Sequence, residues 1–373
     1  MVVPLIGRSA AAVIGGLLVL TAASSLIGTV IVPRPVTSWL TRWADKIVNS
    51  AFRMATAKIS DANRRDRVLA TQAAAILLCQ LGIWLAIFFL GYSLLIWPFV
   101  AGGITAAFTT AGPGLWEIGS VHVTGAAQHA IVDLASLTGI ITVTLQIAYL
   151  PTLYSAFNRR ETEVALLNAR AGVPSWGPEL LARTHYALGS GVSTAGELPA
   201  FYQLWERWAA DVAESHTTYL PLVRFRSPRP KSSWVIALLA VLDSAALYLS
   251  LSPNAAPVVP ARLCLRSGFL CFSDIARAMG IEVPEETDPE GSISLTYDEF
   301  LDAVARMQKV NFPIERDPKD AWPDFVGWRL NYESAAYGIA AAVDAVPALW
   351  SGPRRRAMPA IPPIRPPVGR QPQ

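Results

Sequence analysis

Long runs of apolar residues dominate the N-terminal half of the chain. A helix rises 1.5 Å per residue, so about 20 apolar residues cross the ~30 Å hydrocarbon core of a bilayer. We therefore predict membrane-spanning helices at 10–32, 73–96 and 129–157. The stretches that hold almost no Lys, Arg, Asp or Glu are 10–32, 73–116 and 134–157.

The first predicted span competes with a secretory signal peptide. Small residues near Ala22 and Ser25 would suit a cleavage site. The apolar run continues past them to Val32, however, and only one basic residue, Arg8, precedes it. We therefore favour a helix that is retained in the protein.

A basic segment follows, from Pro33 to Arg67, and its acids only partly balance its cations. The excess of Lys and Arg predicts a cytoplasmic location, which places the N-terminus outside. Trp39, Trp43 and Ile47 recur at a helical period with cations on other faces, as in helices that lie in the lipid interface. A linker helix packed on a cytoplasmic domain is the alternative. The basic residues are Arg34, Arg42, Lys46, Arg53, Lys58, Arg64, Arg65 and Arg67.

The link between the second and third spans has the charge signature of a loop outside the cytoplasm. Residues 100–128 contain no Lys or Arg and a single acid, Glu117, yet the first part of the link is apolar. The run over 68–100 is also too long for one crossing, and Pro98 favours the start of a new helix. We therefore predict a re-entrant element at 98–119, with a short helix that begins at Pro98.

The C-terminal half has the pattern of amphipathic helices. Its most apolar stretch, Trp234–Leu251, is just long enough to span a membrane, but Asp243 lies near its middle. A carboxylate there costs about 2.5–3.5 kcal/mol on insertion scales. We therefore predict a buried helix of a soluble domain, with a fourth span as the alternative. Further on, Thr296 and Glu299 predict a capping box at the start of another helix.

The composition narrows the function classes. Charged residues make up 16% of the chain, against roughly 25% in an average soluble domain, and the net charge is +3. Cations beside apolar spans favour lipid head groups over nucleic acid as partners. The three cysteines have neither disulfide nor metal-site spacing. Glu214, Ser215 and His216 are adjacent on a predicted helix, where neighbours do not face one another. We predict no catalytic residues, no metal, no cofactor and no enzyme activity.

The order helix, short helix, glycine-rich loop, helix is also that of the pore module of potassium channels. The chain has Phe108-Thr109-Thr110-Ala111-Gly112-Pro113-Gly114 between its spans, which resembles the T-T-V-G-Y-G filter of that family. The resemblance implies that backbone carbonyls of this loop line an ion pathway. It also implies a bending point at Gly139. Asp133, one turn into the third span, is expected to shape a vestibule or to pair with Thr105 or Thr124. The candidate filter residues are Thr109, Thr110, Ala111, Gly112, Pro113 and Gly114.

The chain departs from that family in two places. Pro113 replaces the tyrosine, and Leu115 stands where the family has an aspartate. A second filter register, Glu117-Ile118-Gly119, stays open. More broadly, the chain resembles uncharacterised, mostly actinobacterial membrane proteins, through PTLYSAFNRRETEV, WERWAADVAESHTTY, RFRSPRP and AWPDFVGWRLNYE. That resemblance brings no activity with it.

The sequence thus predicts a mainly α protein: a helical membrane domain of three spans and a re-entrant loop, followed by an all-α cytoplasmic domain. We hold two hypotheses, a pore-loop cation channel of the plasma (inner) membrane, or a non-conducting anchored scaffold or sensor. The expected partners are the lipid bilayer, further copies of the chain (four in a channel) and, for a channel, a monovalent cation. The expected parts are an N-terminal span (1–32), a basic helix (33–67), two spans around the loop (68–160), a cytoplasmic helical domain (161–352) and a disordered Pro/Arg-rich tail (353–373).

Overall fold

The structure is a computed structural model that describes residues 2–32, 39–116, 124–185, 195–284, 288, 290–354 and 356–364. Regular structure in these ranges is helical, apart from an isolated bridge between Ala348 and Ile361. The prediction of a mainly α protein is confirmed. The chain divides into two compact units: unit 1 comprises Met1–Lys58 and Thr71–Ser155, and unit 2 comprises Ile59–Ala70 and Ala156–Gln373.

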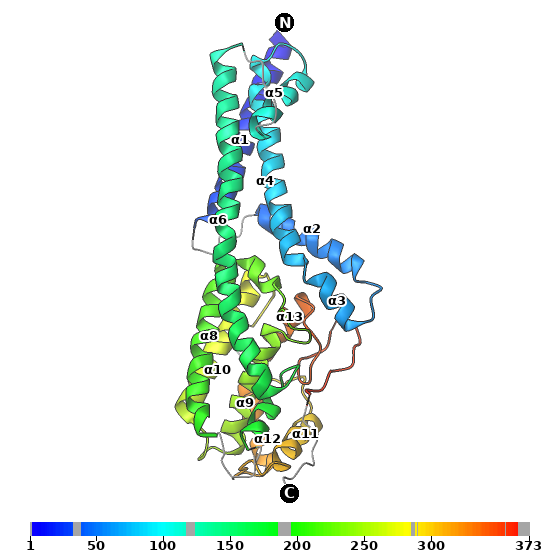
Figure 1. Cartoon of the computed structure of the whole chain (residues 1–373), viewed down its shortest axis with the longest axis vertical. Coiled ribbons are helices and arrows are strands. Elements are labelled where there is room, and N and C mark those ends of the chain that lie inside the picture. The colour runs from blue at the N-terminus through cyan, green and yellow to red at the C-terminus, as the bar shows by residue number, and fades with distance from the viewer. Residues whose placement is uncertain are drawn as a thin grey trace. The chain divides into compact units, whose positions relative to one another are not determined.

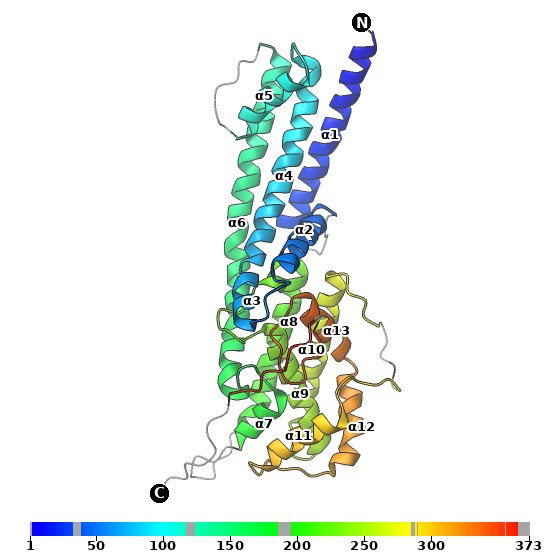
Figure 2. The ribbon, with the colours of Figure 1, turned by 90° about the vertical axis from the view of Figure 1, so that its right-hand side faces the viewer.

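Unit 1 is built around three long helices that run side by side (Figures 1 and 2). The shorter α5 folds back at the end of unit 1 where α1 begins and α4 ends. Two features produce this reversal. One is a 3-10 turn over Trp97–Phe99, and the other is Gly102, whose φ of +130° suits glycine. The helices of unit 1 are α1 (Val2–Val30), α2 (Trp39–Ala55), α4 (Gln72–Ile96), α5 (Ile104–Trp116) and the first part of α6 (Ala126–Ala171).

Small residues and neutral hydrogen bonds hold these helices together. A Cβ on Gly15 of α1 would lie 2.5 Å from the carbonyl oxygen of Gly91 in α4, so only glycine allows this approach. Trp84 Nε1 donates to Ser25 Oγ at 3.0 Å across the same interface. Glycine contacts and side-chain hydrogen bonds of this kind are typical of helix packing in lipid.

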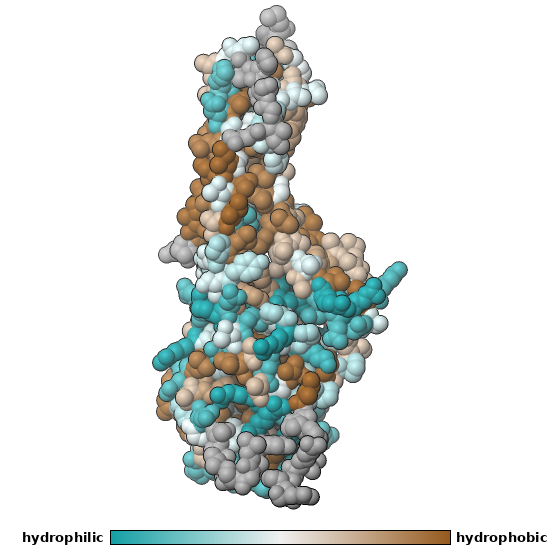
Figure 3. All heavy atoms as spheres, in the orientation of Figure 1, coloured by the Kyte–Doolittle hydropathy of each residue, from teal (hydrophilic) through white to brown (hydrophobic). Residues whose placement is uncertain are grey.

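On the face shown in Figure 3, the middle part of the unit 1 helices is apolar. By length and composition, four helical segments are able to cross a membrane: Gly7–Val30, Ala62–Phe99, Ala126–Ala171 and Trp234–Leu251. The first three expose large apolar side chains, which in water would be an unusually large apolar surface. The protein is therefore embedded in a membrane. The exposed apolar residues of unit 1 include Val13, Leu17, Leu20, Leu78, Leu134, Leu137, Ile140 and Ile147.

Unit 2 is organised around α9 (Trp234–Leu251), the fourth of those segments. Every residue of α9 except the partly buried Leu249 is buried, as the sequence predicts for a helix that is hydrophobic all round. Helices α7, α8, α10, α12 and α13 contact it. Gly177 lets α7 approach closely, because a Cβ there would lie 2.7 Å from the carbonyl oxygen of Ala240.

The helices around α9 turn charged residues outward. Arg207 and Glu214 of α8 and Arg262 and Arg266 of α10 are exposed. Such a surface suits water rather than hydrocarbon, so α9 is a core helix and not a span. The remaining helices are α3 (Ala62–Leu69), α7 (Gly177–Thr184), α8 (Leu198–Thr218), α10 (Val258–Ala278), α11 (Tyr297–Gln308), α12 (Pro318–Arg329) and α13 (Glu333–Ala342), with 3-10 turns at Ala195–Glu197 and Leu220–Arg224.

The basic segment predicted as one helix forms two helices that belong to different units. α2 packs on α4 through Leu40, Ala44 and Val48 and leaves Trp39 and Trp43 exposed. α3 begins at a side-chain cap, Asp61, and belongs to unit 2. Only α2 thus has the exposed aromatic stripe of an interfacial helix.

The capping box on α11 is confirmed: Thr296 Oγ1 accepts from the Glu299 amide at 3.3 Å, and the Glu299 carboxylate accepts from the Thr296 amide at 2.9 Å. The Pro/Arg-rich tail differs from its prediction in its first part, which packs on unit 2. Arg356 donates to the carbonyl oxygen of Ile59 at 3.0 Å, and Arg183 donates to that of Ile364 at 2.7 Å. The first part of the tail has no core of its own, and hydrogen bonds to unit 2 hold it in place.

Candidate functional site

The candidate filter residues do not form a loop. Thr109 to Gly114 lie inside α5, where Thr110 Oγ1 donates to the carbonyl oxygen of Ala106 at 2.7 Å. The prediction of an extended filter at these residues is therefore wrong. A helix satisfies its backbone groups within the segment, which is the favoured solution in apolar surroundings, and here it extends through Pro113. The predicted short helix also begins at Ile104 and not at Pro98.

The small residues of the predicted filter serve helix packing instead. Ala111 is buried, and a Cβ on Gly112 would lie 3.3 Å from the ring of Phe89. Ser136 Oγ of α6 donates to the carbonyl oxygen of Gly114 at 2.8 Å. That oxygen is engaged by a neighbouring span and does not face an open pathway.

Gly139 allows a close approach between α6 and α5. A Cβ at Gly139 would lie 2.2 Å from the carbonyl oxygen of Leu115, and α6 is continuous through this position. Asp133 is exposed, and no hydrogen bond joins it to Thr105 or Thr124, all three of which lie in the described part of the chain. The alternative register, Glu117, Ile118 and Gly119, lies outside the described residues.

A fully buried ionic cluster lies in the core of unit 2, where the sequence predicts only Asp243. Arg329 of α12 donates to Asp243 of α9 at 2.5 Å and to Glu333 of α13 at 2.6 Å. Tyr332 Oη donates to Asp243 at 2.8 Å. Burial raises the pKa of Asp243 to about 6, although Arg329 opposes the rise. Burial also disfavours the charged guanidinium, but Asp243 and other neighbours hold the pKa of Arg329 well above its usual value.

A second buried cluster surrounds Arg160 of α6, which the sequence places at the end of a span. Its guanidinium contacts His216 Nε2 at 2.9 Å and donates to the carbonyl oxygens of Leu222, at 2.9 Å, and Phe225, at 2.7 Å. Burial, and then the charge of Arg160, lowers the pKa of His216 well below 6.5. Ser215 Oγ also lies 3.0 Å from His216 Nδ1, a contact that sequence reasoning excluded.

Ion pairs also attach α3 to distant parts of unit 2. Arg65 pairs with Asp344, which follows α13, and Arg226 Nε donates to Asp66 at 2.5 Å. Arg226 Nη1 also donates to the carbonyl oxygen of Val343 at 3.0 Å. These partners are far apart in sequence, so no local pattern signals them.

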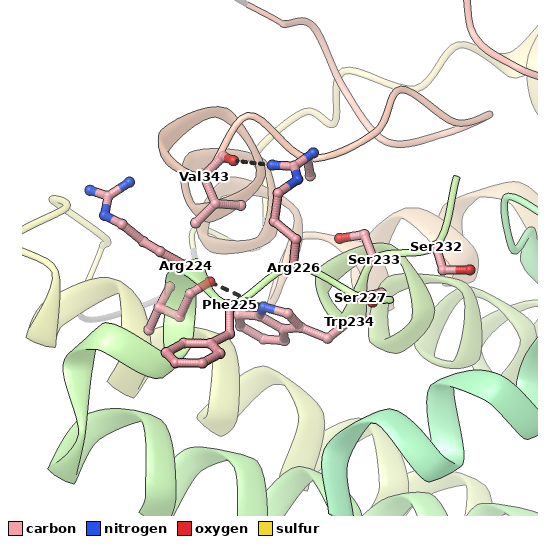
Figure 4. A pocket seen from close by; sticks show the side chains of 10 residues that line it. Arg224, Phe225, Arg226, Ser227, Ser232, Ser233, Trp234 and Val343 are labelled. Carbon is pink, nitrogen blue, oxygen red and sulfur yellow. Dashed lines mark hydrogen bonds between the residues drawn. The ribbon is translucent and has the colours of Figure 1, made fainter. Parts of the chain in front are cut away.

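A small, partly open pocket lies beside this ionic attachment, at the N-terminus of α9 (Figure 4). We call it the α9 pocket. Arg226 and Val343 stand on one side of it and Trp234 on the other, and Ser227 lies beside Ser233 and Trp234 (Figure 4). The sequence contributes RFRSPRP only as a resemblance, although its three arginines and no acid are a signal for anion chemistry. The pocket is lined by Val223, Arg224, Phe225, Arg226, Ser227, Ser232, Ser233, Trp234, Val343 and Ala345.

Comparisons with protein-family models, with curated proteins and with solved structures gave no match to this chain.

Proposed function

We propose that the protein is a non-conducting membrane anchor and sensor, in which the spans of unit 1 hold unit 2 at the cytoplasmic face of the plasma membrane. The observation that supports this most is the continuity of α6. This helix includes Ala126–Ala171 without a break, so its first part belongs to unit 1 and its last part to unit 2. The span and unit 2 thus share one chain segment, which also contains Pro151.

The end of α6 is fixed within unit 2. Arg160 is fully buried, and its hydrogen bonds attach α6 to the turn that leads toward α9. Trp208 of α8 donates to the carbonyl oxygen of Arg160 at 3.1 Å. A buried charge with several partners has one favoured geometry, so this end of α6 is held in one place in unit 2.

Unit 1 supports anchoring better than conduction. The helix at Thr109 to Gly114 uses its carbonyl groups internally and toward Ser136, whereas a filter needs a column of carbonyls facing the ion. The exposed stripe of Trp39, Trp43 and Ile47 on α2, flanked by Arg42 and Lys46, suits the lipid interface.

The conduction question is tested with purified full-length protein in liposomes loaded with potassium. We expect efflux equal to that of protein-free liposomes, while valinomycin, added at the end, releases the trapped ion. Potassium efflux that rises with protein content and is lost in Gly112→Leu would overturn the proposal.

The orientation is tested by labelling single cysteines in intact cells with a membrane-impermeant maleimide. Asn254→Cys and Ala127→Cys place thiols at exposed positions of unit 2 and unit 1. Cys79 is replaced by alanine in both, and the buried Cys264 and Cys271 remain. We expect Ala127→Cys to react in intact cells and Asn254→Cys only after lysis. The reverse pattern would place unit 2 outside the cytoplasm.

A further inference from the structure

The α9 pocket combines the features of an anion site, beginning with a long helix whose N-terminus faces it. α9 runs from Trp234 to Leu251, and its N-cap residue, Ser233, makes no side-chain capping hydrogen bond. The first amides of a helix have no partners within the helix and carry a partial positive charge. Backbone N–H groups at such a terminus are able to bind phosphate or sulfate.

A second observation, independent of the helix, is an unsatisfied hydroxyl. Ser227 lines the α9 pocket and is only 9% exposed, yet its Oγ has no hydrogen-bond partner. A buried polar group without a partner costs about 1–3 kcal/mol. A ligand oxygen in the pocket would accept this hydrogen bond and remove that cost.

The charges around the pocket favour an anion. The segment 223–234 contains Arg224, Arg226, Arg229 and Lys231 and no acid. The lining also contains no carboxylate. Two acids lie nearby: Asp66 accepts from Nε of Arg226, and the carboxylate of Asp344 pairs with Arg65.

Arg226 keeps donor capacity for a ligand. Its Nη1 donates to the carbonyl oxygens of Val343 and Asp344, and its Nη2 donates once, to Asp344 at 3.2 Å. A guanidinium has five N–H donors, so one on Nη2 is left. Arg224 acts at longer range, since its guanidinium turns away from Ser233 (Figure 4).

We infer that the α9 pocket binds a phosphate monoester group. Serine hydroxyls, an arginine and a helix N-terminus are the donors that such a group takes. The enclosed part of the pocket is close to the size of a water molecule, so phosphate oxygens would enter it while the ester stays at its open mouth. A soluble phosphorylated molecule and the head group of phosphatidic acid share this chemistry.

Binding at this place would act on several segments of unit 2 at once. The pocket walls come from the loop before α9 and from the turn after α13, and Arg226 joins both to α3 through Asp66. Arg160 of α6 lies 5.7 Å from the Trp234 ring on the pocket wall. The inference depends on the pocket alone and holds whether or not the protein is a sensor.

The test uses full-length protein in nanodiscs of phosphatidylcholine, titrated with inorganic phosphate by calorimetry at constant ionic strength. A second arm uses nanodiscs that also contain phosphatidic acid. In both arms, hydrogen exchange measures protection of the amides at 225–236. Saturable phosphate binding indicates a soluble ligand, and protection by phosphatidic acid alone indicates a lipid; either result supports the inference.

Two variants and their controls locate the binding. We expect Ser227→Ala to weaken binding about fivefold and Ser227→Asp, which places a carboxylate in the pocket, to abolish it. Since the buried Ser227 hydroxyl has no partner, Ser227→Ala should unfold at or above the wild-type temperature. Ser273→Ala and Ser273→Asp on α10 are the matched controls and should bind normally. Absence of both binding and protection, or binding that Ser227→Asp leaves intact, overturns the inference.

Discussion

Unit 1 buries neutral polar groups between its helices, whereas unit 2 buries complete charges. Across unit 1, the contacts are Trp84 with Ser25 and Tyr92 with Thr138, at 3.0 and 2.7 Å. In unit 2, Arg160 and Arg329 are both fully enclosed. A segment in lipid has no water to supply hydrogen bonds and few charges to bring inside. A domain folded in water is able to bury a charge if every donor finds a partner.

The two units also differ in what lies outside. Unit 1 exposes apolar side chains such as Leu20 and Ile147, and unit 2 exposes charged ones such as Arg207 and Arg266. Burial of apolar surface from water therefore stabilises unit 2. Close packing and hydrogen bonds between helices stabilise unit 1. This contrast predicts which substitutions have large effects in each unit.

The largest effect is expected from Arg329→Met in unit 2. Removing one partner of a buried pair leaves Asp243 and Glu333 enclosed without the guanidinium, which typically costs 3–5 kcal/mol. Urea unfolding in detergent micelles, followed by tryptophan fluorescence, measures the change. The control Arg266→Met, at an exposed position, should stay within about 0.5 kcal/mol. Equal stability of the two variants would mean that the cluster is not desolvated.

The next effect concerns the glycine contact in unit 1. Gly15→Ala places a Cβ 2.5 Å from the carbonyl oxygen of Gly91, so the helices must separate, and a loss of about 1–3 kcal/mol is expected. Gly28→Ala on the same helix meets nothing within 4 Å. Alanine is the better helix former, so this control should gain up to about 1 kcal/mol. Unfolding in mixed detergent and SDS micelles measures the stability change of both variants. If both variants gained or both lost stability, the close contact at Gly15 would be refuted.

The architecture was largely predictable, because apolar run length and helical periodicity are local signals. The spans, the buried α9 and the Thr296 capping box all follow from such patterns. The glycine-rich segment was misread because glycine and proline favour loops in water, while the backbone of α5 satisfies itself as a helix among apolar neighbours. The ionic clusters were not predictable, since Arg329 and Asp243 meet only through the packing of α12 on α9.

A smaller, pH-dependent effect is expected at His216. Its pKa in the folded protein is lowered well below 6.5, because burial and Arg160 disfavour the charged ring. The stability that depends on the neutral ring is therefore complete above pH 6.5 and lost as the pH falls. The slope for one proton is about 1.4 kcal/mol per pH unit.

His216→Gln removes that slope and keeps an acceptor for Arg160. Asp243, with a pKa raised to about 6, contributes a slope of opposite sign between about pH 4 and 6, because its protonated form favours the folded state. Since Asp243 is present in both proteins, the difference between wild type and variant isolates His216. Parallel stability curves between pH 7 and 5 would show that the ring is charged in the folded protein.

The smallest effect is expected where unit 1 uses a hydrogen bond in place of a charge pair. Ser25→Ala removes the acceptor for Trp84 Nε1, both residues being buried between α1 and α4. Hydrogen bonds between membrane helices contribute about 0.6 kcal/mol on average, because the unfolded chain in lipid also finds partners. Ser24→Ala, at the exposed neighbouring position, is the control. A double-mutant cycle with Trp84→Phe, measured in micelles, should give a coupling near that value. A coupling of several kcal/mol, as large as the Arg329 effect, would contradict the contrast between the two units.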